Sequence, residues 1–145
     1  MVGLPGAGKT TFYRQRLADH AHVSKDLMKN ASRKGSRQLA QIDEALRAGR
    51  SVAVDNTNAR AADRAPLIAA ARARGARVVG YYLDTAAAEC ARRNRQREGR
   101  ERVPDVAIYV TASRLERPAR AEGFDALYRV RAAEGGFELA AMEED

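Results

Sequence analysis

Cysteine is almost absent from this sequence: Cys90 is the only one in 145 residues. A single thiol excludes a disulfide within the chain and suits a reducing cytoplasm, where we expect the protein to reside. Cys90 lies in an alanine-rich stretch that is expected to be helical. We therefore expect it to be a small core residue rather than a nucleophile.

Long apolar runs are also missing. The apolar stretches are short strands or alanine-rich helix faces, so no segment could cross a bilayer and no membrane partner is expected. The N-terminus lacks the charged start and the apolar run of a signal peptide. There is no internal repeat, linker or low-complexity tract, and the length is typical of one domain. We expect a single domain over residues 1–145.

Acidic residues are outnumbered by basic ones. Lys and Arg number 26 against 19 Asp and Glu, which gives a formal net charge of +7. A bias toward arginine codons would explain this excess, and so would an anionic partner, because basic surfaces attract phosphate-bearing ligands. Arginines crowd residues 91–102, ARRNRQREGRER. A charged helix face is usually only solvated, so this segment needs a second argument before it counts as functional.

Apolar periodicity and chain breakers predict alternating strands and helices. The expected strands are residues 20–24, 51–55, 76–84 and 124–132, and the expected helices are 10–18, 35–49, 58–75, 85–98 and 105–116, with a hairpin or tail over 135–145. This alternation predicts an α/β fold of three αβα layers, in which helices cover both faces of a parallel sheet. Ligands of such sheets bind at the carboxyl ends of the strands.

The sequence GLPGAGKT, from Gly3 to Thr10, has the spelling G-x-x-x-x-G-K-[ST] of a P-loop. Its glycines let backbone N–H groups form a nest for the β-phosphate at the start of the following helix. Lys9 can reach the β and γ oxygens, and the Thr10 hydroxyl can ligate Mg²⁺. The residues expected to bind the nucleotide here are Gly3, Pro5, Gly6, Ala7, Gly8, Lys9, Thr10 and Thr11.

Only Met1 and Val2 precede this loop. In a P-loop NTPase-type fold the loop follows a central strand, which needs about five residues. We therefore expect the central strand to be truncated and the native chain to begin upstream.

Two aspartates follow predicted strands and are expected in the same cleft. Asp55 ends a buried strand, and a carboxylate there suits a role toward Mg²⁺ beside Thr10, although alone it would more often be a turn or cap residue. Asp26 and Lys29 are three residues apart, which places them on one face of a helical turn. One possibility is that Asp26 and Lys29 simply form an ion pair within the helical turn. The other is that Asp26 takes the proton of an acceptor hydroxyl while Lys29 binds an anionic part of the acceptor.

The arginine-rich segment has the character of a lid. Arg93 and Arg97 are four residues apart, so a helix would present both guanidinium groups on one face, and Gly99 would let the segment close. Arginine closing on ATP would stabilise charge in the transition state and exclude water. We expect these arginines to contact ATP beside the catalytic residues Lys9 and Asp26.

Across nearly its whole length the chain resembles the 5′-hydroxyl polynucleotide kinase family, and most closely the kinase domain of polynucleotide kinase/phosphatase repair enzymes. The stretches that carry the resemblance are GLPGAGKTTF, SKDLMKN, SVAVDNTNARAADRAPLIAAARARG, CARRNRQRE, VPDVAIYV and AEGFDALYRV. The resemblance implies ATP and Mg²⁺ as cofactors, and DNA or RNA 5′-hydroxyl ends as acceptor.

The resemblance also implies roles for single residues. Asp26 matches the general base, and Arg97 matches the lid arginine that touches the γ-phosphate. Lys29 matches a position, often arginine, that contacts the 3′-phosphate of the acceptor; lysine keeps the charge and loses the bidentate fork. Val103 and Pro104 match residues that pack against the acceptor nucleoside.

Two other functions stay open on the sequence. A kinase of the same architecture could phosphorylate a small molecule such as a sugar, nucleoside or antibiotic, because fold does not fix substrate. A non-catalytic module that binds ATP or RNA is the other possibility, and the short first strand favours it.

Overall fold

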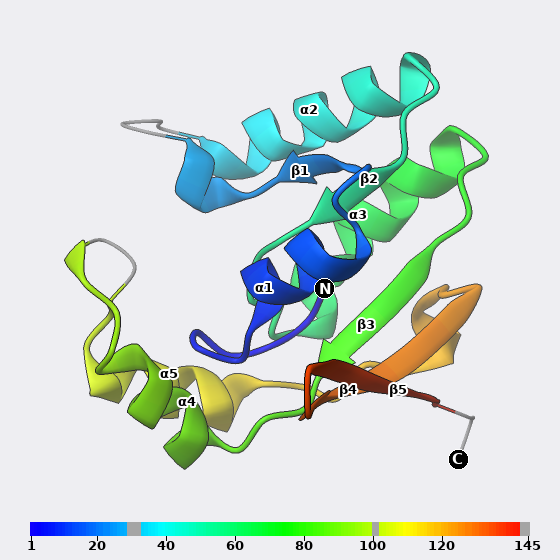
Figure 1. Ribbon diagram of the computed structural model, residues 1–145. Helices are drawn as coiled ribbons and strands as arrows, with labels where there is room; N and C mark the ends of the chain where they lie inside the picture. Colours follow the sequence, from blue (N-terminus) through cyan, green and yellow to red (C-terminus); the bar gives the residue numbers. More distant parts are fainter. Residues whose placement is uncertain (29–32, 100–101, 143–145) are drawn as a thin grey trace.

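The computed structural model describes residues 1–28, 33–99 and 102–142 (Figure 1). Strands and helices alternate along the chain as the sequence predicts. In chain order the elements are α1 (Lys9–Arg16), β1 (Ala21–Val23), η1 (Lys25–Leu27), α2 (Lys34–Arg47), β2 (Val52–Val54), α3 (Ala61–Ala73), β3 (Val79–Leu83), α4 (Ala87–Asn94), α5 (Asp105–Arg114), η3 (Arg120–Glu122), β4 (Ala126–Ala133) and β5 (Gly136–Ala141). The chain therefore has the three-layer α/β fold of P-loop NTPases. Among the described residues no helix is long and apolar enough to span a bilayer.

The strands form two small sheets that meet at the start of the chain. β1 pairs with β2 in parallel, β3 pairs with β4 in parallel, and β5 closes an antiparallel hairpin on β4. Val2 forms a single parallel bridge with Tyr82, and the Met1 amino group donates to the carbonyl oxygen of Val54 at 3.0 Å. The first two residues thus hold the central position between β2 and β3, where the sequence predicts a truncated strand.

A cavity of about 500 Å³ lies beside this bridge. Its walls include Val52–Val54 of β2, Val79 and Tyr81 of β3, and Ile68 of α3. In a parallel ladder, successive residues point their N–H and C=O groups to alternate sides. The Tyr81 carbonyl accepts from the Val2 N–H at 2.8 Å, so this side of β3 faces the Val2 bridge and the cavity beside it.

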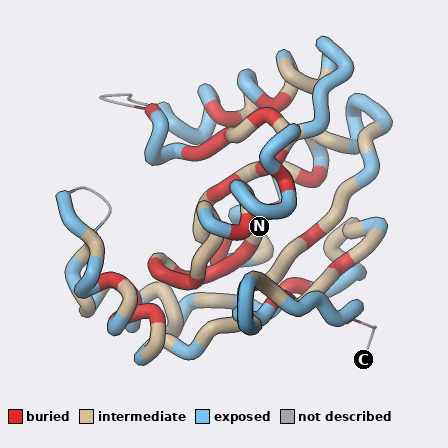
Figure 2. Tube along the Cα trace, in the orientation of Figure 1, coloured by how far each residue is buried: buried red, intermediate tan, exposed pale blue. Residues whose placement is uncertain are grey.

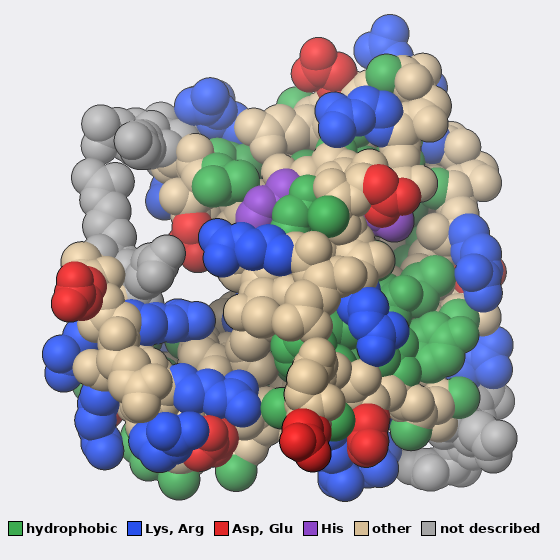
Figure 3. All heavy atoms as spheres, in the orientation of Figure 1, with side chains coloured by type: hydrophobic (Ala, Val, Ile, Leu, Met, Phe, Trp, Pro, Cys, Tyr) green, Lys and Arg blue, Asp and Glu red, His purple; other side chains and the backbone are tan. Residues whose placement is uncertain are grey.

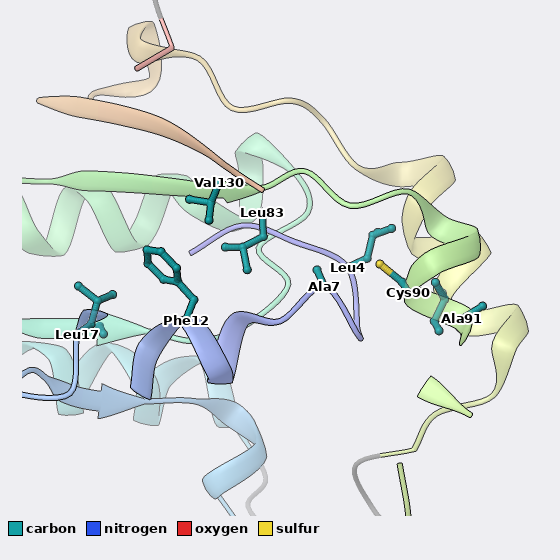
Figure 4. Close-up of a cluster of buried hydrophobic side chains, with 10 residues drawn as sticks. Leu4, Ala7, Phe12, Leu17, Leu83, Cys90, Ala91 and Val130 are labelled. Carbon is teal, nitrogen blue, oxygen red and sulfur yellow. The ribbon is translucent and has the colours of Figure 1, made fainter. Parts of the chain in front are cut away.

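An apolar core lies beneath the Gly-rich loop (Figures 2 and 4). Its buried members are Leu4, Ala7, Phe12, Leu17, Ala53, Leu83, Cys90, Ala91, Ile108 and Val130. Leu4 and Ala7 belong to the loop itself, and Cys90 and Ala91 face them from α4. The prediction that Cys90 is a core residue is confirmed, since it is 0% exposed. Packing from below fixes the backbone of the loop.

A buried ion pair ties α3 to the segment that leads into β4. Arg64 of α3, whose side chain is 3% exposed, donates from Nε and Nη2 to the two carboxylate oxygens of Glu122 at 2.7 and 3.0 Å. Its Nη1 donates to the carbonyl oxygens of Asn58 and Ala59 at 2.8 and 3.1 Å. Arg64 thereby holds the loop that follows β2. This pair links two of the stretches that carry the family resemblance, DNTNARAADR and AEGF.

Glu122→Ala is expected to destabilise the fold by about 3 kcal/mol, because it leaves a buried guanidinium without its carboxylate. The double variant Arg64→Met, Glu122→Leu should recover only part of that loss, since it removes both charges but also the donor to the Asn58 and Ala59 carbonyls. Unfolding by denaturant measures both effects. Asp43→Asn is the matched control: its pair with Arg74 is 40% and 42% exposed, so the change should stay near zero. Equal effects of Glu122→Ala and the control would contradict the role given to the buried pair.

Candidate nucleotide and phosphoryl-transfer site

The Gly-rich loop depends on glycine at two positions. Gly6 and Gly8 have φ angles of 85° and 99°, in the left-handed region that favours glycine. A Cβ at Gly6 would also lie 2.6 Å from the carbonyl oxygen of Cys90 on α4. The loop can therefore turn tightly and touch α4 only because these side chains are missing. Helix α1 begins at Lys9, directly after the turn, as a phosphate nest requires.

Lys9 folds back over the loop. Its Nζ donates to the carbonyl oxygens of Gly3 and Leu4 at 2.9 and 3.0 Å. Burial is the main cause that lowers the pKa of Lys9 from 10.5 to about 8; the charge of Asp55 opposes this shift, and the charge of Arg97 adds to it. An ammonium in this position is ready to exchange two carbonyls for phosphate oxygens.

Asp55 lies at the centre of a polar cluster next to the loop. Its side chain is 5% exposed, and its Oδ2 accepts from the Thr10 hydroxyl at 2.9 Å and from His22 Nε2 at 2.8 Å. The His22 ring stacks on Tyr13 with centroids 4.1 Å apart, and the Tyr13 hydroxyl donates to the carbonyl oxygen of His20 at 2.7 Å. The carboxylate is thus held from α1 and from β1.

The predicted pair of Thr10 and Asp55 fits Mg²⁺. A hydroxyl and a carboxylate are oxygen ligands of the kind that Mg²⁺ prefers, and this ion usually takes one or two protein groups together with phosphates and water. Because the Thr10 hydroxyl gives its hydrogen to Asp55, its lone pairs are left for a cation. The structure therefore brings the two together, as expected from a strand end beside the loop.

The residues after Asp55 hold neighbouring segments in place. Asn56 Oδ1 accepts from the backbone N–H of Lys25 at 2.9 Å, and its amide donates to Gln38 of α2. The Thr57 carbonyl accepts from the N–H of Gly3 at 3.0 Å, and Asn58 Nδ2 donates to the Met1 carbonyl at 2.8 Å. The DNTN stretch therefore fixes η1 on one side and the start of the loop on the other.

Asp26 lies on η1, at the carboxyl end of β1. The turn is capped by Ser24, whose Oγ accepts from the Asp26 N–H at 3.2 Å. The Asp26 side chain is exposed, and its negative charge is close enough to Lys9 to raise the pKa of that ammonium. The predicted base therefore lies on an element whose charge acts on the lysine of the Gly-rich loop. Lys29, predicted to bind the acceptor, lies outside the described residues.

The lid arginines differ from the prediction. Helix α4 ends at Asn94, so Arg93 is helical and Arg97 follows the helix; the expectation that both lie on one helix face is wrong. Arg93 Nη1 donates to the Ala7 carbonyl at 3.4 Å, while its Nε donates to Glu89 at 3.2 Å. Arg97 is half-buried, and its charge lowers the pKa of Lys9. Arg93 therefore reaches the loop by a hydrogen bond, while Arg97 acts on the loop lysine through its charge.

Asn94 explains why the helix stops. It is 0% exposed, and its side chain accepts from the Val103 N–H at 2.9 Å and donates to the Val103 carbonyl at 2.5 Å. This contact joins the end of α4 to the residues before α5, where Val103 is half-buried and Pro104 is exposed. Figure 3 shows a hollow between the side that carries η1 and the side that carries α4, with Lys and Arg side chains along its lower edge.

Sequence reasoning missed three of these residues. His22 stands two residues after His20, and this spacing does not predict the hydrogen bond between His22 and Asp55. Asn56 and Asn94 are ordinary polar residues until their partners on other elements are known. The pairing of β1 with β2 places His22 opposite Ala53, two residues before Asp55. This pairing, which brings His22 close to Asp55, is known only from the structure.

A family model described as an AAA domain, AAA_33, matches residues 1–120. The match includes the Gly-rich loop, η1, the DNTN stretch and α4 with its arginines. The hairpin of β4 and β5 lies outside it.

His22→Phe keeps an aromatic ring against Tyr13 and removes the hydrogen bond to Asp55. We expect the gain in ADP affinity that Mg²⁺ provides to fall about tenfold, because partners of a metal-site carboxylate tune its affinity. Titration calorimetry with Mg²⁺ or with EDTA measures this gain. His20→Phe, which removes only a contact with exposed Asp19, is the control. If His22→Phe leaves the Mg²⁺ effect intact, His22 does not orient Asp55.

Proposed function

The chain belongs to the AAA_33 family of AAA domains, and from this membership and the geometry of the site we propose that it is an ATP-dependent kinase acting on 5′-hydroxyl ends of DNA or RNA. A P-loop nucleotide-binding domain is the established part of this conclusion. One observation supports the rest: the charges of Asp26, on η1, and of Arg97, in the segment after α4, both act on the pKa of Lys9, which Asp26 raises and Arg97 lowers. A site that only binds nucleotide needs no carboxylate there.

The proposed reaction transfers the γ-phosphoryl group in one step. The Asp26 carboxylate accepts the proton of the 5′-hydroxyl while the hydroxyl oxygen forms a bond to the γ-phosphorus. The bond from that phosphorus to the bridging oxygen breaks, and ADP leaves. Phosphoryl transfer relies mainly on positioning and on stabilised charge, so a carboxylate and nearby cations are sufficient protein groups.

Lys9 and Arg97 would stabilise the charge on the transferring group. Lys9 exchanges the Gly3 and Leu4 carbonyls for β and γ oxygens, and Arg97 approaches from the lid side. Mg²⁺ held near Thr10 and Asp55 would neutralise charge on the same phosphates. Burial of Asp55 and Lys9 lowers the local dielectric, which strengthens each of these interactions.

The acceptor would lie in the hollow between η1 and α4. Val103 and Pro104 offer apolar contacts for a nucleoside, and we assign Lys29 to an acceptor phosphate. The net charge of +7 and the basic edge in Figure 3 suit a polyanion. A kinase that acts on a sugar, nucleoside or antibiotic would use the same catalytic base and the same nucleotide site. Only its acceptor would distinguish it from a polynucleotide kinase.

Asp26→Asn should abolish transfer of labelled phosphate from ATP to a 5′-hydroxyl oligonucleotide, by at least about a hundredfold, because the general base is lost. ADP affinity should be unchanged, since Asp26 is exposed and serves the acceptor. Asp19→Asn removes an exposed carboxylate at the opposite end of β1 and should retain activity. Equal transfer by Asp26→Asn and wild type would refute the assigned base. ADP binding by a wild type that never transfers phosphate to the oligonucleotide would point first to a small-molecule acceptor and then to a non-catalytic module.

Salt separates the two acceptor classes. Binding through backbone phosphates should weaken steeply between low and physiological salt, because it releases counterions. A neutral sugar should scarcely respond. The KM for the oligonucleotide, measured over a salt series at saturating ATP, is therefore expected to rise steeply. A flat series would point to a small-molecule acceptor.

A further inference from the structure

The hairpin of β4 and β5 reaches back to the nucleotide loop. Phe137 of β5 packs on Phe12 of α1 in an edge-on contact, with ring centroids 5.3 Å apart. Its carbonyl oxygen accepts from Arg16 Nη2 at 3.0 Å. Three residues thus anchor the hairpin on the helix that begins at the loop, although the family match ends before the hairpin.

The Phe137 ring and the Arg93 guanidinium meet at the same point of the loop. From the position that a Cβ would take on Gly8, Phe137 Cε1 and Cζ lie at 3.7 and 3.8 Å, and Arg93 Nη1 lies at 3.8 Å. The two groups come from β5 and from α4, and Gly8 leaves the space between them open. Glu89 and the Ala7 carbonyl hold Arg93 in this position.

We propose that Phe137 and Arg93 form the site for the base of the bound nucleotide. This inference rests on the proposed nucleotide binding and extends it to the base. The phosphates bind at the N–H groups of the loop, so ribose and base must leave along its rim. Aromatic rings and guanidinium planes both stack on nucleobases, and here they flank one exit from the loop.

The chemistry of the two groups suits a flat aromatic ligand. Phe137 is half-buried and has a large apolar face without hydrogen-bonding groups. Arg93 adds a planar cation whose side chain is 30% exposed. The Phe137 ring gains from a purine surface placed against it, and gains nothing from a polyphosphate that lacks a base. A comparison of ADP with a polyphosphate that lacks a base therefore tests the proposal.

The test compares ADP with inorganic tripolyphosphate by titration calorimetry. Phe137→Leu keeps apolar contact with Phe12 but loses the aromatic face, so the Kd for ADP should rise about tenfold while the Kd for tripolyphosphate stays constant. Phe137→Tyr should retain the affinity for ADP. Phe124→Leu is the matched control, because Phe124 lines the cavity near Gly80 and lies away from the loop.

Each remaining outcome overturns the proposal in a different way. Unchanged ADP affinity in Phe137→Leu would remove the base site and leave the proposed kinase intact. Equal losses for ADP and tripolyphosphate would show that Phe137 acts on the loop rather than on the base. Failure of the folded wild type to bind either probe would overturn the proposed function together with this inference.

Discussion

The buried ammonium of Lys9 is the interaction on which the site depends. It bonds to the carbonyls of Gly3 and Leu4, inside a loop whose own side chains belong to the core. Burial disfavours its charge, and the nearby carboxylate of Asp55 partly compensates. A polyphosphate would supply the missing counter-charge. Binding energy and the conformation of the loop are therefore coupled through one side chain.

The surrounding structure serves to hold the partners of this lysine. Asp55 is fixed by Thr10 and His22, and the residues that follow it fasten η1, which carries Asp26. On the other side Cys90 packs against Gly6, which sets the distance between α4 and the loop. These contacts join elements that are distant in sequence. They explain why short strands suffice to position a site.

The sequence predicted the parts that local pattern determines. The loop spelling, the order of strands and helices and the core position of Cys90 all follow from spacing and composition. The meeting of Asp55 with Thr10 followed from the rule that strand ends share an edge. The end of α4 was missed because it depends on Asn94 bonding to Val103 across the lid. His22 and Phe137 were missed for the same reason: each acquires its role from a partner on another element.

The ionisation of Lys9 offers the most direct measurement. The chain has only four lysines, so the ε-CH₂ signal of Lys9 can be followed by NMR over a pH series, with Lys9→Arg to assign it. Burial predicts a midpoint of about 8 in the free protein. Addition of ADP should move it upward, because phosphate favours the charged form. A midpoint near the ordinary 10.5 in the free protein, or one that ADP does not move, would contradict the account.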